Sequence, residues 1–120
     1  MIPLTHRLPL ALAGLLVALP ALSNDFPTVE RVLYVQDCMN GRPGPYYEMV
    51  NKCSCALDAL ASQIKFDDYV QISTAAKANS IGGERGSYIR DAEMLQQQIK
   101  RYRELQSKAQ VGCFLGPDPR

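Results

Sequence analysis

Residues 45–64, PYYEMVNKCSCALDALASQI, decide the fold of this chain. Their apolar positions recur at steps of three and four residues, the spacing of one face of an α-helix: Tyr46, Val50, Cys53, Leu57, Leu60, Ala61 and Ile64. Pro45 suits the first turn of this helix, because a backbone N–H is not needed there. The stretch therefore predicts an amphipathic helix that carries two of the four cysteines of the chain.

The helical phase limits how these cysteines can pair. Each residue turns about 100°, so Cys53 and Cys55 point to different sides of the helix and should not bond each other. Each must reach a different partner, Cys38 or Cys113. We favour the pairs Cys38–Cys55 and Cys53–Cys113, because Cys53 shares the apolar stripe that the longest helix should cover. The crossed choice, Cys38–Cys53 with Cys55–Cys113, stays open.

The rest of the chain alternates between helical periodicity and Gly/Pro breakers. Three further helices are expected, at about residues 28–40, 67–81 and 87–109. Each starts at a residue whose side chain can cap a helix: Thr28, Asp67 and Ser87. The last is the longest, and its apolar stripe begins at Tyr88. We predict an all-α fold, a small bundle of about four helices stapled by two disulfides.

The first 23 residues have the pattern of a secretion signal. His6 and Arg7 precede an apolar run of about a dozen residues, against the roughly 20 that a membrane-spanning helix needs. Small residues at positions 21 and 23 suit a signal peptidase. We expect cleavage after Ser23.

Three segments follow from this cleavage site: a cleaved signal peptide at 1–23, a helical disulfide-stapled domain at 24–116, and a flexible tail at 117–120. Four cysteines in a small exported chain indicate an oxidising compartment and a disulfide framework. We therefore expect a periplasmic or secreted protein, with no membrane insertion after the signal is removed.

Composition excludes several functions. The only histidine, His6, leaves with the signal, which removes a histidine base, a Ser-His or Cys-His pair and an imidazole metal ligand. Without Arg7 the chain has equal numbers of acidic and basic residues, so no net positive charge would attract nucleic acid. We predict no catalytic residue, no cofactor and no bound metal.

One alternative uses the sulfur atoms chemically. Cys53 and Cys55, with Met39 and Met49, form a soft-ligand set that could hold Cu(I). A C-x-C pair can also exchange disulfides, although the C-x-x-C motif typical of thiol oxidoreductases is absent. A copper or thiol-redox factor is therefore the alternative function.

Surface residues near a helix joint are candidates for binding a partner. The segment Gly82–Gly86 precedes a helix but matches no nucleotide-binding pattern. Glu84, Arg85 and Arg90 stand in or near this joint, and Tyr47 is one of six tyrosines that could form an interaction surface. These four residues are the predicted interaction sites.

Around residues 52–58 (KCSCALD) and 82–86 (GGERG), the chain resembles a group of small exported four-cysteine proteins of Gram-negative bacteria. Some of these are associated with periplasmic quinoprotein alcohol-oxidation systems. The resemblance implies a periplasmic location and an accessory role, and it transfers no catalytic residue. We therefore predict a non-enzymatic accessory protein that binds another exported or periplasmic protein.

Overall fold

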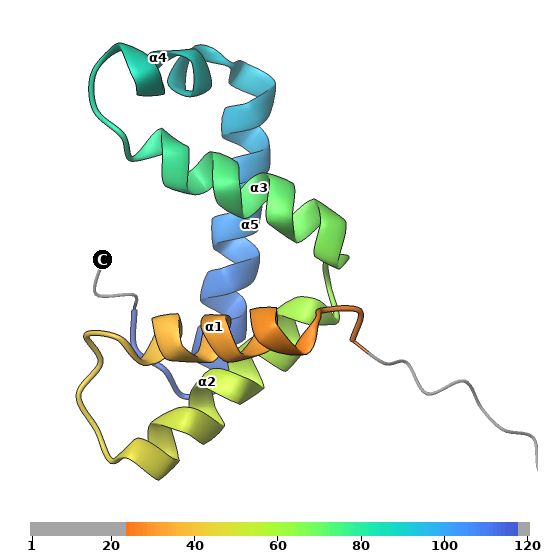
Figure 1. The fold of residues 1–120 in the computed structure, drawn as a ribbon, viewed down its shortest axis with the longest axis vertical. Coiled ribbons are helices and arrows are strands. Elements are labelled where there is room, and N and C mark those ends of the chain that lie inside the picture. Colours follow the sequence, from red (N-terminus) through yellow and green to blue (C-terminus); the bar gives the residue numbers. More distant parts are fainter. Residues whose placement is uncertain (1–23, 118–120) are drawn as a thin grey trace, which may run out of the picture.

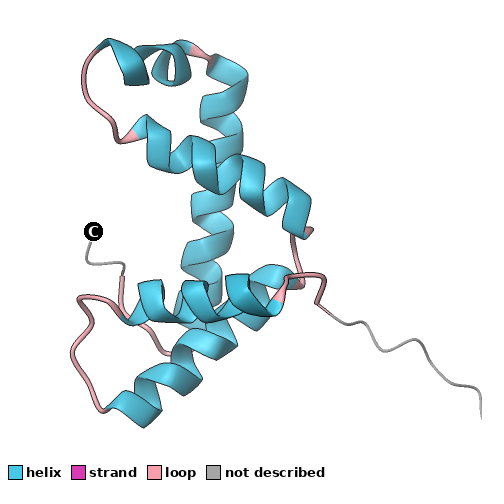
Figure 2. Ribbon diagram, in the orientation of Figure 1, coloured by secondary structure: helices cyan, strands magenta, loops and turns pink. Residues whose placement is uncertain are grey.

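The computed structural model describes residues 24–117, and the predicted signal peptide and the residues after Pro117 lie outside this part. Within it the chain forms five α-helices and no strand (Figures 1 and 2). The helices are α1 (Thr28–Met39), α2 (Tyr46–Ala61), α3 (Phe66–Asn79), α4 (Glu84–Asp91) and α5 (Glu93–Gly112). The all-α prediction is confirmed, with one helix more than expected.

The helices form two halves that share α5. Helices α1 and α2 pack together and α2 packs on α5, while α3 and α4 pack on each other and on α5. In Figure 1, α5 runs from α4 at the top of the molecule to α2 at the bottom. Both disulfides lie in the lower half. No helix between residues 24 and 117 is long and apolar enough to cross a membrane.

An aromatic cluster connects the two halves. The ring of Phe26, just before α1, lies 5.2 Å from that of Phe66 and 4.8 Å from that of Tyr69, at the start of α3. Tyr69 in turn lies 6.1 Å from Tyr102 on α5. Aromatic pairs at these separations are favourable beyond the area they bury. The cluster therefore fixes the beginning of α3 against α1 and α5.

The expected side-chain caps were wrong. Helix α3 begins at Phe66, one residue before Asp67, and the Phe66 N–H donates to Asp25 Oδ2 at 3.0 Å. Asp25, 41 positions earlier in the sequence, thus supplies an acceptor to a backbone N–H that has no hydrogen-bond partner within the helix. Thr28 is the first residue of α1, after Pro27, and makes no cap bond.

The expected long helix from Ser87 is two helices, broken at Ala92, whose backbone is extended (φ −84°, ψ 98°). Ser87 lies inside α4, and its hydroxyl donates to the Glu84 carbonyl at 2.7 Å. The Gln96 amide of α5 donates to the Ile89 carbonyl at 2.7 Å and to Asn79 Oδ1 at 2.8 Å. The first bond gives a donor to a carbonyl in the last turn of α4. The second attaches the start of α5 to the end of α3.

Candidate binding surfaces

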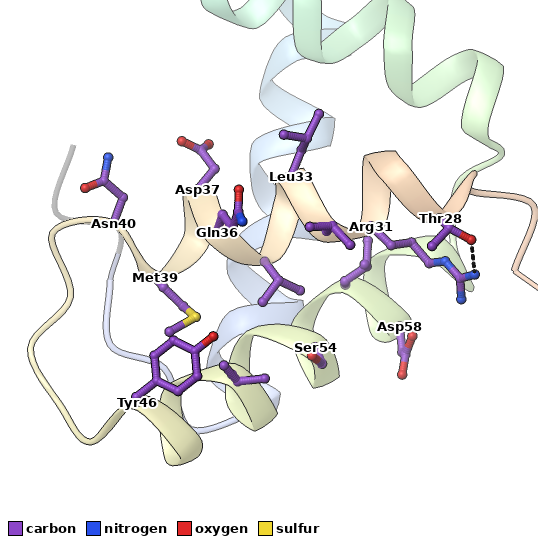
Figure 3. A pocket seen from close by; sticks show the side chains of 14 residues that line it. Thr28, Arg31, Leu33, Gln36, Asp37, Met39, Asn40, Tyr46, Ser54 and Asp58 are labelled. Carbon is purple, nitrogen blue, oxygen red and sulfur yellow. Dashed lines mark hydrogen bonds between the residues drawn. The ribbon is translucent and has the colours of Figure 1, made fainter.

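An open groove of about 1040 Å³ lies between α1 and α2 (Figure 3). Val35, Val50 and the buried Leu57 line it. Met39 and Tyr46 stand together at one end (Figure 3). Arg31 and Asp58 lie at the other end, where Arg31 Nη2 donates to Thr28 Oγ1 at 3.3 Å. The lining is therefore mixed, because polar side chains such as Gln36, Asp37 and Ser54 stand among the apolar ones.

Helix α1 is apolar on more of its surface than the fold buries. Its inner side contributes Tyr34 and Cys38 to the core. Val29, Val32 and Leu33 are 61%, 50% and 51% exposed. They are spaced at i, i+3 and i+4, so they form one strip along the helix. Exposed apolar patches that are rimmed by polar residues are typical of binding surfaces.

A second cleft of about 660 Å³ is lined by residues of α1, α3 and α5. Its lining is more polar and includes Tyr69 and Ser73 of α3, Glu30 of α1 and Gln106 of α5. Burial raises the pKa of the Tyr69 phenol above its ordinary value, and the nearby carboxylates of Glu30 and Asp37 add to this effect.

The disulfides are Cys38–Cys53 and Cys55–Cys113, with Cα atoms 5.9 and 5.8 Å apart. The expectation that Cys53 and Cys55 take separate partners is confirmed. The favoured pairs, Cys38–Cys55 and Cys53–Cys113, were wrong, and the crossed choice is correct. The physical reason is that both α1 and α5 pack on α2, so a place on the apolar stripe did not distinguish their cysteines.

The sulfur atoms of the alternative copper or redox site do not converge as free ligands. Cys53 and Cys55 belong to different disulfides, and no cysteine is free. Met49 is buried and Met39 is half-buried against the core. Among residues 24–117, no group of three or more His, Cys, Asp or Glu side chains is placed to hold a metal ion.

The predicted interaction residues do not form one surface. Tyr47 lies exposed on α2, whereas Glu84, Arg85 and Arg90 lie on α4 at the opposite end of the molecule (Figure 1). The Arg90 guanidinium donates to the carbonyls of Ile81 and Gly83. Arg90 therefore holds the loop before α4, which is a structural contact.

Apolar periodicity alone does not distinguish a helix face in the core from one in an open groove. Tyr46 and Tyr88 share the predicted inner stripes, yet they are 78% and 82% exposed. One signal was present: the apolar residues of α1 cover a wider arc than one packed face requires.

No family model, curated protein or solved structure matches the chain at a significant level.

Proposed function

We propose that this chain is a non-enzymatic exported protein that binds an apolar segment of another exported protein in the groove between α1 and α2. The observation that supports it most is the exposed strip Val29, Val32 and Leu33 beside that groove. Hydrophobic grooves between helices commonly receive the apolar face of a partner helix.

The buried disulfide makes this groove suitable for binding. Cys38 near the end of α1 is joined to Cys53 in the middle of α2, and both side chains are in the core. The relative position of the two groove walls is therefore fixed before a partner arrives, which lowers the entropy lost on binding. Two disulfides also support a periplasmic or secreted location, because thiols stay reduced in the cytosol.

Site-specific photo-crosslinking in cells tests the proposal. A benzoylphenylalanine at position 32, in the groove, should give one discrete cross-linked partner. The same residue at position 111 is the matched control, because Val111 is also exposed on a helix and does not line the groove. Equal cross-linking at both positions would contradict the proposed site.

Binding of the purified partner should then depend on groove chemistry. Val32→Glu should weaken it by about tenfold or more, since a charge replaces an apolar contact, whereas Val111→Glu should leave it unchanged. Both positions are exposed, so stability should move by less than about 0.5 kcal/mol. Stoichiometric copper or reactive thiols in protein isolated from its native compartment would favour the copper or redox alternative instead.

A further inference from the structure

Helix α5 ends in a hydrogen-bonding motif that normally requires glycine. The Leu115 N–H donates to the Gln110 carbonyl at 2.9 Å, and the Phe114 N–H donates to the Val111 carbonyl at 3.1 Å. This pair of hydrogen bonds defines the Schellman motif, in which the residue with a left-handed backbone is usually glycine. Here that residue is Phe114, with φ of 61°. A residue with a side chain is disfavoured in this conformation, so the choice of Phe works against stability.

The residues on both sides hold Phe114 in this conformation. Cys113 is bonded to Cys55 of α2, and the side chain of Leu115 is buried in the core. The ring of Phe114 is 84% exposed, more than any other large apolar side chain between residues 24 and 117. A strained residue whose side chain adds nothing to the core points to a function at that residue.

A cavity of about 270 Å³ lies beside Phe114. Met49, Pro43 and Pro117 contribute apolar walls, and Arg42 contributes a cation. Lys52 also lines it, but its Nζ already lies 2.6 Å from Glu48 Oε1. The volume is below the range of about 300–1,000 Å³ that is typical of small-molecule pockets. It suits one or two side chains of a docking segment.

The Arg42 guanidinium has an unused donor in this region. Its Nη1 donates to the Gly116 carbonyl at 2.8 Å. Its Nη2 is buried and has no hydrogen-bond partner among the described residues. A buried donor without an acceptor is unfavourable, so a small turn of the Arg42 side chain that brings this donor to an acceptor in the cavity is favourable. A carboxylate is the most favourable acceptor, because the donor is charged.

We propose that this cavity binds an acidic peptide segment of a partner protein. In this arrangement a carboxylate of the segment accepts a hydrogen bond from Arg42, and an adjacent apolar side chain packs on the ring of Phe114. The cavity shares no lining residue with the groove between α1 and α2, so this site does not depend on the function proposed for that groove.

A pair of synthetic peptides tests the site on the full chain with both disulfides formed. The probe is acetyl-Asp-Leu-Asp-Phe-Glu-amide, and its control is the neutral acetyl-Asn-Leu-Asn-Phe-Gln-amide. In a ¹⁵N NMR titration the acidic peptide should give saturable shifts centred on Arg42 and Phe114. The neutral peptide should bind at least about tenfold more weakly, a difference of about 1.4 kcal/mol.

Substitution of Phe114 separates binding from folding. Phe114→Gly removes the ring and also relieves the strain of the left-handed backbone. It should therefore weaken binding of the acidic peptide by about tenfold while raising Tm by about 2–6 °C. Arg42→Gln should also weaken binding of the peptide and reduce the dependence of that binding on salt concentration. Tyr88→Ala is the matched control, since Tyr88 is equally exposed on α4, and its binding should be unchanged.

Four results of the peptide experiments would overturn the proposal. They are the absence of saturable binding, equal affinity for the neutral peptide, full affinity in Phe114→Gly, and loss of binding in Val32→Glu, which would place the peptide in the other groove. Inorganic phosphate that shifts the same resonances with the same affinity would also overturn it, because the site would then recognise an anion alone.

Discussion

Cys55 and Cys113 join the outer side of α2 to the end of α5, and they differ sharply in exposure: Cys55 is open to solvent, and Cys113 is 4% exposed. The other disulfide, Cys38–Cys53, is closed to solvent at both ends, with exposures of 6% and 0%.

This difference predicts the order in which the disulfides are reduced. A reductant must reach a sulfur atom, so mild reduction should open Cys55–Cys113 first and leave Cys38–Cys53 intact. The first step should cost about 4 kcal/mol of stability in the chain-entropy model, since the bond closes a loop of 58 residues. Alkylation and mass spectrometry after graded reduction would identify the order. Simultaneous reduction of both bonds would contradict it.

Gly86 on α4 should not tolerate alanine, although alanine normally favours a helix. A Cβ at this position would lie 2.0 Å from the Ile81 carbonyl oxygen, which is backbone and cannot move alone. We expect Gly86→Ala to lower the free energy of unfolding by about 1–3 kcal/mol. Gly112→Ala is the control, because nothing lies within 4 Å of its Cβ, and it should stabilise α5 by up to about 1 kcal/mol. Chemical denaturation measures both; a gain in Gly86→Ala would show that this loop can shift.

Asp25 should matter more to α3 than the acidic residues of that helix. Its carboxylate accepts the Phe66 N–H, so Asp25→Ala should cost about 1 kcal/mol, the usual effect of losing an N-terminal cap. Asp67→Ala should cost only a few tenths of a kcal/mol, because Asp67 acts through the helix dipole alone. Thermal denaturation of the two variants compares them, and a larger loss in Asp67→Ala would refute this assignment.

Tyr69 should make the protein sensitive to alkali. Burial, with Glu30 and Asp37 nearby, raises its pKa in the folded state. As pH rises past about 10, the unfolded chain loses this proton first, so the free energy of unfolding falls until the folded phenol also ionises. Tyr69→Phe keeps the ring and should lose less stability between pH 8 and pH 11 than the wild type. Tyr88→Phe, at an exposed position, serves as the comparison; an equal effect there would contradict a special role for Tyr69.

Local periodicity predicted the directions in which side chains leave a single helix. It could not predict which other helices pack on each of its faces. The turn of 100° per residue separated Cys53 from Cys55, and the structure agrees. The choice of partner depended on the packing of α1 and α5 around α2, which sequence spacing does not contain. Tyr46 is a second example, because its position in the apolar periodicity of α2 predicted burial, whereas its side chain is exposed.

The ends of the helices depended on distant residues. No breaker stands at Asp91-Ala92-Glu93, and the helix is interrupted where Gln96 bonds to Ile89 and Asn79. Phe114 is a further case, since its left-handed backbone follows from anchors on either side. The two binding surfaces proposed for this chain both come from such tertiary effects, so the sequence alone could not locate them.

The order of the disulfides along the chain affects how the protein matures. Each bond joins cysteines that follow one another in the sequence, the first with the second and the third with the fourth. A chain that enters an oxidising compartment amino end first exposes Cys38, then Cys53 and, two residues later, Cys55, all well before Cys113. An oxidase that joins cysteines in order of arrival therefore forms the native pairs directly. We expect the oxidised protein to accumulate without help from a disulfide isomerase.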